Sequence, residues 1–160
     1  MLPITEVGMV QTRRKVLLSV TCLLPLDAMG QSAPSTLPKG RRIAIGGYDP
    51  VAYFTDGQPQ KGSEAFWVAF DDGVYLFKSA DNRNKFQADP ERFAPQYAGW
   101  CAAGVSKGYK TEPDPEAWAI LNGKLYLFQF KERVPGFKQD TAFIDKANGN
   151  WPTVKDTTAR

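Results

Sequence analysis

The side chain with the clearest chemical potential in this sequence is one cysteine, Cys101. The chain has no histidine, and its other cysteine, Cys22, lies with all three methionines in the first thirty residues. Thiol or soft-metal chemistry outside that stretch therefore depends on Cys101. A cysteine hydrolase needs a base, normally histidine, and a thioredoxin-type enzyme needs a second cysteine nearby. The sequence argues against both classes, whereas one-cysteine redox chemistry with an external thiol stays open.

Small residues surround Cys101 in the run Gly99-Trp100-Cys101-Ala102-Ala103-Gly104. Small neighbours allow a ligand or another backbone segment to come close. If Cys101 lies at the start of a helix, the helix dipole favours a thiolate, and Lys107 adds to this effect if the chain folds it back. The alternative is an unreactive core cysteine, because free cysteine is among the most buried residue types.

A second candidate group lies about fifty residues before Cys101 and begins with Asp49-Pro50, which has the chemistry of a turn. One interpretation is an Asx-turn flanked by two core tyrosines. The other places phenol groups and a carboxylate beside Cys101, in a pocket with aromatic walls and a few polar groups, as is typical of ligand pockets. The predicted pocket residues are Tyr48, Asp49, Tyr53, Tyr97, Trp100 and Lys107.

The elements that position these residues are indicated by an internal repeat at an offset of 51 residues. The matching pairs are Trp67 with Trp118, Tyr75-Leu76-Phe77 with Tyr126-Leu127-Phe128, Phe86 with Phe137, and Asp89 with Asp140. Each copy has an apolar run, a turn and a second apolar run, which predicts a β-hairpin, followed by a segment of helical periodicity. We therefore predict an α+β fold: a mostly antiparallel sheet from two repeated β-hairpin–helix units, with helices packed on one face.

The first thirty residues predict an export signal. Thr12-Arg13-Arg14-Lys15 precedes an apolar run that is too short to span a bilayer, and Ala28-Met29-Gly30 offers small residues for cleavage. The paired arginines also resemble a twin-arginine signal, so this route and the general secretory route both stay open. We expect a periplasmic or secreted protein with no stable membrane insertion after removal of the leader.

Composition divides the chain into four parts. We predict a signal peptide at 1–30, a flexible tether rich in proline, serine and basic residues at 31–42, one folded domain at 43–152 and a tail at 153–160. Without its first thirty residues the chain is close to neutral, which provides no electrostatic case for binding nucleic acid.

Three runs within 43–152 resemble the YHS-domain family. They are Gly47-Tyr48-Asp49-Pro50-Val51-Ala52-Tyr53-Phe54, Tyr75-Leu76-Phe77-Lys78-Ser79-Ala80-Asp81-Asn82, and Tyr97-Ala98-Gly99-Trp100-Cys101-Ala102. The order of these runs is most similar to an exported bacterial branch of YHS domain-containing (seleno)proteins. In that branch the position that matches Cys101 can be selenocysteine, so the resemblance implies a reactive sulfur or selenium atom there.

The resemblance also implies a possible metal, copper, which other YHS domains are thought to bind through a pair of cysteines. In this chain the matching positions are Lys78 and Asn82. One thiol cannot complete a shell for Cu(I) or Zn(II), so a metal site requires Cys101 to be shared across a homodimer.

Three functions follow from these observations. The first is a binding or accessory module for a small molecule, with a pocket around Cys101. The second is a thiol-dependent redox enzyme that uses the same sulfur with an unidentified redox partner. The third is a copper-binding protein that acts as a dimer. The sequence alone does not fix a reaction.

Overall fold

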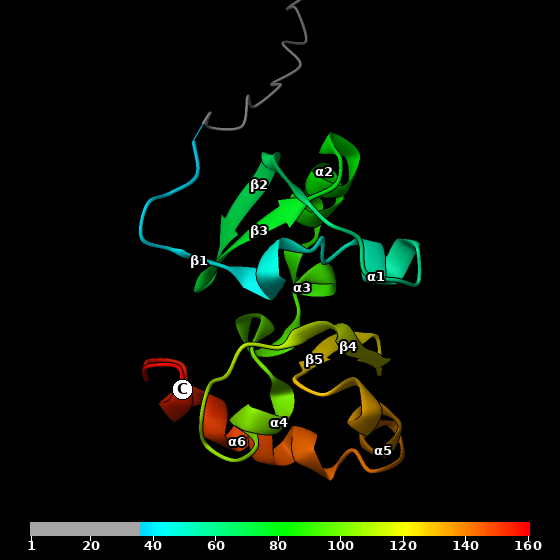
Figure 1. Cartoon of the computed structure of the whole chain (residues 1–160), viewed down its shortest axis with the longest axis vertical. Helices are drawn as coiled ribbons and strands as arrows, with labels where there is room; N and C mark the ends of the chain where they lie inside the picture. Colours follow the sequence, from blue (N-terminus) through cyan, green and yellow to red (C-terminus); the bar gives the residue numbers. More distant parts are fainter. Residues whose placement is uncertain (1–35) are drawn as a thin grey trace, which may run out of the picture. The chain divides into compact units, whose positions relative to one another are not determined.

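A computed structural model describes residues 36–160, and Figure 1 shows the arrangement of their elements. The five strands in this range are β1 (Arg42–Ile43), β2 (Ser63–Phe70), β3 (Gly73–Phe77), β4 (Asp114–Leu121) and β5 (Lys124–Phe128). The six α-helices in this range are α1 (Ala52–Thr55), α2 (Ala80–Ala88), α3 (Pro90–Phe93), α4 (Ala102–Val105), α5 (Val134–Gln139) and α6 (Ala142–Val154). The 3-10 helices of the same range are η1 (Ala44–Gly47), η2 (Gln96–Gly99) and η3 (Lys131–Arg133).

The first sheet is built on an antiparallel hairpin of β2 and β3, to which the short β1 adds in parallel. Side chains alternate along β3, as the pleat of a strand requires. Tyr75 and Phe77 face the Phe86 ring of α2, with ring centroids 5.3 and 5.2 Å apart. The opposite face of β3 presents Val74 and Leu76, which pack with Trp67 of β2.

The second sheet is the antiparallel hairpin of β4 and β5. Its turn residues, Asn122 and Gly123, both adopt positive φ, which is the geometry that the Asn-Gly dipeptide predicts. Leu125 and Leu127 belong to one hydrophobic cluster with the core of the first hairpin, whereas Tyr126 and Phe128 belong to another. The second hairpin is therefore buried on both faces.

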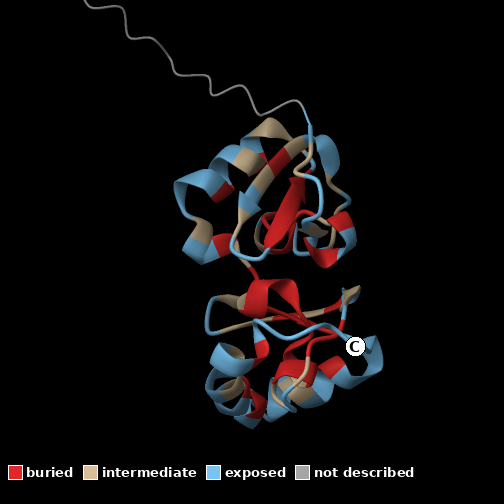
Figure 2. Ribbon diagram, turned by 90° about the vertical axis from the view of Figure 1, so that its left-hand side faces the viewer, coloured by how far each residue is buried: buried red, intermediate tan, exposed pale blue. Residues whose placement is uncertain are grey.

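The predicted mixture of helix and antiparallel hairpin is confirmed at the level of fold class. Residues 36–160 contain two small, mainly antiparallel sheets together with the six α-helices. Figure 2 shows buried residues gathered along the central strands, while the outer helices carry long exposed stretches. The fold is held mainly by aromatic and aliphatic packing.

The predicted leader and residues 31–35 of the predicted tether lie outside the described residues. Within the rest of that tether, Leu37 packs against the face of Trp67, Val74 and Leu76, and β1 begins at Arg42, one residue before the predicted start of the domain. Arg42 Nε lies 2.7 Å from Glu112 Oε1. None of the helices described in residues 36–160 is both long and apolar enough to cross a membrane.

The Asn148-Gly149 dipeptide is typical of a helix C-terminus, but α6 continues through both residues to Val154. Glycine costs a helix only about 1 kcal/mol, and contacts made by the same turns outweigh that cost. Asn148 accepts a hydrogen bond from the Tyr97 hydroxyl at 2.9 Å, and Asn150 donates to the carbonyl oxygen of Val105 at 3.1 Å.

The Phe86 ring should be a principal source of stability. It is fully buried and contacts the rings of Phe70, Tyr75 and Phe77. We expect Phe86→Ala to lower the free energy of unfolding by about 3–5 kcal/mol, because it removes a large buried side chain and leaves a cavity. Urea denaturation followed by circular dichroism measures the change. The control Phe130→Ala removes a ring that is 46% exposed and should change stability by less than about 1 kcal/mol.

Candidate functional site

Cys101 lies between η2 and α4 and is held by its backbone to two other segments. Its amide donates to the carbonyl oxygen of Thr111 at 3.1 Å, and it forms a parallel bridge with Leu127 of β5. Its residue surface is only 2% exposed, and its thiol forms no disulfide among residues 36–160. The position of the sulfur is therefore set by the buried second hairpin.

Packing explains one of the small residues after Cys101, Gly104. A side chain at Gly104 would place its Cβ 3.1 Å from both Thr111 Cγ2 and the Tyr109 carbonyl oxygen. Because Gly104 has no side chain, the loop that follows α4 packs closely against the helix. This close approach forms one wall of a cavity.

The cavity has a volume of about 650 Å³ and includes Cys101 in its lining. One wall comes from α4 and the following loop, including Lys107 and Tyr109, and the other comes from residues 129–146. The structure thus brings together two of the predicted pocket residues, Cys101 and Lys107. The second wall was not anticipated; its residues include Gln129, Arg133, Phe137, Phe143 and Lys146.

The lining contains three basic and two acidic side chains. Lys107, Arg133 and Lys146 contribute positive charge, against Glu132 and Asp140. The Asp140 carboxylate already accepts a hydrogen bond from the Ala142 amide at 3.0 Å. No ion pair found within residues 36–160 involves any of the three cations. The cavity therefore combines a sulfur atom, aromatic rings and cations that face solvent.

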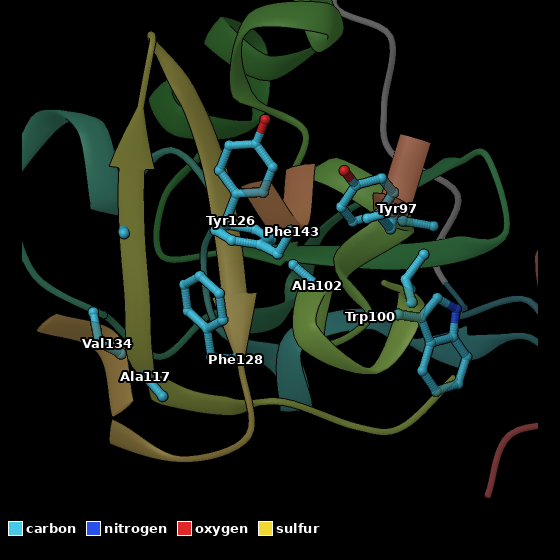
Figure 3. Close-up of a cluster of buried hydrophobic side chains, with 12 residues drawn as sticks. Tyr97, Trp100, Ala102, Ala117, Tyr126, Phe128, Val134 and Phe143 are labelled. Atoms are coloured by element: carbon cyan, nitrogen blue, oxygen red, sulfur yellow. The ribbon is translucent and has the colours of Figure 1, made fainter. Parts of the chain in front are cut away.

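Tyr97 and Trp100 were predicted to line the pocket, and the structure places them elsewhere. The Tyr97 hydroxyl donates to Asn148, and burial raises the pKa of this phenol above its usual value. The Trp100 ring lies beneath the Arg42 guanidinium, whose carbon is 3.7 Å from the ring centroid. Figure 3 shows the Trp100 indole on the far side of Ala102 from Phe128. Both residues are near Cys101 in sequence, but their side chains belong to the packing around it.

Asp49 also lies outside the cavity lining. Its hydrogen bonds are those of the Asx-turn interpretation. Its carboxylate is fully buried, and Oδ1 accepts from the Val51 and Ala52 amides at 2.8 and 3.3 Å. Oδ2 accepts from the Lys78 amide at 2.9 Å and from the Asn82 side-chain amide at 2.7 Å. The carboxylate thus accepts four hydrogen bonds, which join the turn at Asp49-Pro50 to the start of α2.

The two tyrosines beside Asp49 also lie outside the cavity lining, and Tyr53 contacts β4 of the second hairpin. The Tyr53 hydroxyl donates to the Pro115 carbonyl oxygen at 3.0 Å, and its ring meets the Trp118 ring edge-on. Tyr48 is half-buried, with the Lys61 ammonium 4.6 Å from its ring centroid. Neither phenol is in the lining of the cavity that contains Cys101, because the run around Asp49 packs into the hydrophobic cluster that the two hairpins share.

No family model, curated protein or solved structure matches this chain.

The Asp49 carboxylate should be required for stability. We expect Asp49→Ala to lower the free energy of unfolding by at least about 3 kcal/mol, because it leaves buried donors without an acceptor. The matched change Asp49→Asn keeps one acceptor oxygen and should cost less. Thermal and urea denaturation of both variants measure the difference. Equal stability of Asp49→Ala and the wild type would contradict the structural role assigned to this residue.

Stability should also fall at alkaline pH through Tyr53. Burial, with a smaller contribution from Glu116, raises the pKa of this phenol above its usual value of about 10. Above pH 10 the unfolded chain loses the phenol proton while the folded chain keeps it, so the free energy of unfolding decreases as pH rises.

The variant Tyr53→Phe isolates this effect. At pH 7 it should be less stable than the wild type by about 1 kcal/mol, because the hydrogen bond to Pro115 is lost. Between pH 10 and 11 the difference should shrink, because the variant has no phenol to titrate. Urea midpoints measured across this range decide the question, and a difference that stays constant with pH would contradict the role of burial.

Proposed function

We propose that this chain is an exported small-molecule binding module of YHS type, whose ligand occupies the cavity that Cys101 and Lys107 line. The observation that carries the proposal is the cavity itself. Its volume of about 650 Å³ lies within the roughly 300–1,000 Å³ that is usual for small-molecule sites. It also combines aromatic surface with a few polar and charged groups, as such sites do.

The aromatic rings of the cavity wall are held in place by contacts with one another and with Phe128. Phe137 stacks on Phe128, with ring centroids 4.4 Å apart and an interplanar angle of 5°. Phe143 meets both of these rings edge-on. Rings fixed in this way lose little freedom when a ligand binds, so the wall is organised before binding.

We also propose that the domain consists of two repeated hairpin–helix units, as a duplicated YHS-like domain would. The hairpins β2–β3 and β4–β5 have the same strand lengths at an offset of 51 residues. In both, the pairing is irregular just before the matching tryptophan, Trp67 or Trp118. Phe86 and Phe137 contact the corresponding phenylalanines of β3 and β5. These correspondences support the proposal independently of the sequence identities.

Copper does not fit the residues at the positions that the family resemblance indicates. Lys78 forms an ion pair with Asp56, and Asn82 donates to the Asp49 carboxylate. Residues 36–160 contain no group of three or more histidine, cysteine or acidic side chains arranged to hold a metal ion. Cys101 is also too deeply buried for two copies of the protein to join their sulfur atoms without local opening.

A thiol-dependent redox enzyme is the second candidate, because the sulfur reaches the wall of a cavity that a small oxidant could enter. In that case a peroxide would oxidise the Cys101 thiol to a sulfenic acid with release of water or an alcohol. One external thiol would then form a mixed disulfide with release of water, and a second external thiol would release the Cys101 thiol as the external disulfide forms. Rapid loss of alkylatable Cys101 with peroxide, and its recovery with an external thiol, would favour this candidate over simple binding.

Filling the cavity tests the first proposal. Gly136 lines the cavity, and a side chain there meets no atom within 4 Å of its Cβ; the same open space surrounds Gly149 of α6, which is outside the lining. Gly136→Phe should slow alkylation of Cys101 by iodoacetamide at least about tenfold, because the ring blocks the route to a buried sulfur. The matched control Gly149→Phe should not. Peptide mass spectrometry follows Cys101 separately from Cys22.

Native mass spectrometry of the exported protein tests whether a ligand is present. A co-purified small molecule should be retained in Gly149→Phe and lost in Gly136→Phe. Equal alkylation rates in the two variants, with a bound mass that persists in both, would place the ligand elsewhere and overturn the proposal.

A further inference from the structure

Cys101 occupies the same backbone position in the second half of the domain as Asp49 does in the first. The Asp49 amide donates to the Gln60 carbonyl oxygen at 2.8 Å, and the Cys101 amide donates to the Thr111 carbonyl oxygen at 3.1 Å. These donors are 52 residues apart in the chain and the acceptors are 51 apart. The preceding turns also match, because both η1 and η2 contain two consecutive residues of positive φ before a glycine.

The residues that face these two positions correspond as well. Asp49 is held from the chain after β3, by the Lys78 amide and the Asn82 side chain. Fifty-one residues later, after β5, stand Gln129 and Arg133. Both line the cavity together with Cys101. In the second half, the three positions that correspond to Asp49, Lys78 and Asn82 therefore all line one cavity.

The two halves differ in charge at these corresponding positions. In the first half the carboxylate belongs to the protein, and the donor at position 82 is a neutral amide. In the second half Cys101 brings no carboxylate, and the donor position carries the guanidinium of Arg133. The Arg133 guanidinium carbon lies 5.3 Å from the Phe130 ring centroid, and no ion pair found in residues 36–160 neutralises it. Lys107 and Lys146 add positive charge to the same lining, which also contains Glu132 and Asp140, so basic side chains exceed acidic ones by one.

We infer that the ligand of this cavity is a small organic carboxylate, held through its carboxylate by Arg133 near Gln129 and Cys101. Its apolar part would lie against Phe137 and Phe143, which line the same cavity. The ligand carboxylate would take the place that the Asp49 side chain takes in the first half. This inference rests on the proposed binding function and specifies the class of ligand.

Two aromatic probes of equal shape test the inference on the full chain by isothermal titration calorimetry. The probe 2-naphthoate carries a carboxylate, whereas 2-naphthamide is neutral. The wild type should bind 2-naphthoate more tightly. Arg133→Gln should weaken its binding about 3–30-fold, the range expected for one partly exposed charge-assisted hydrogen bond, and should change binding of 2-naphthamide less than about twofold.

The matched control is Arg92→Gln. Arg92 is exposed on α3 and lies over the neighbouring Phe93 ring, as Arg133 lies over Phe130, but it does not line the cavity. It should leave the binding of both probes unchanged. Cys101→Asp places a carboxylate at the position that corresponds to Asp49, and it should weaken binding of 2-naphthoate at least about tenfold through repulsion between like charges.

Different results overturn the inference and the function on which it rests. If the two probes bind equally well to the wild type, if neither binds, or if Arg133→Gln binds 2-naphthoate unchanged, the carboxylate assignment is wrong. If Gly136→Phe leaves binding of both probes unchanged, they do not occupy the cavity, and the proposed binding site itself fails. Because Arg133 is exposed, Arg133→Gln should fold. The test of the carboxylate assignment therefore stands even if Cys101→Asp fails to fold.

Discussion

The burial of β5 on both faces is the constraint on which the rest of the structure depends. Leu125 and Leu127 complete the core of the first hairpin, and Tyr126 and Phe128 complete the core that includes α6. Neither cluster is complete without this strand. A strand buried on both faces must be apolar at every position, and four consecutive residues of β5, from Leu125 to Phe128, meet that requirement.

The same strand positions the chemistry. Cys101 bridges to Leu127, and the chain leaves β5 directly into Gln129 and the second wall of the cavity. Cys101 and Arg133 are 32 residues apart in sequence, but Cys101 bridges to β5 and Arg133 lies in η3, which follows that strand. A site supported in this way can hold a ligand without a large rearrangement of the backbone.

The hairpins could be predicted from the sequence because their signals are local. Apolar runs on either side of the Asn122-Gly123 turn determine pairing within a few residues of chain. The cavity could not be predicted in the same way. Its second wall depends on how residues 129–146 pack against α4. Packing between segments distant in sequence has no short sequence motif from which it could be predicted. Asp49 was placed beside Cys101 because both lie in runs of aromatic and small residues, but its carboxylate is used entirely by donors from its own half.

Trp100 links residues near the two ends of the described region. Arg42, near the start of that region, lies over one indole together with the Lys110 ammonium, which is 5.2 Å from the ring centroid. Lys110 in turn accepts a hydrogen bond from the amide of the last residue, Arg160, at 2.9 Å. Arg42 of β1 therefore contacts Trp100 directly, and Arg160 is linked to the same indole through Lys110. Domains whose ends lie close together tolerate circular permutation, so a short linker from residue 160 to residue 42, with new termini opened at an exposed turn, should preserve the fold.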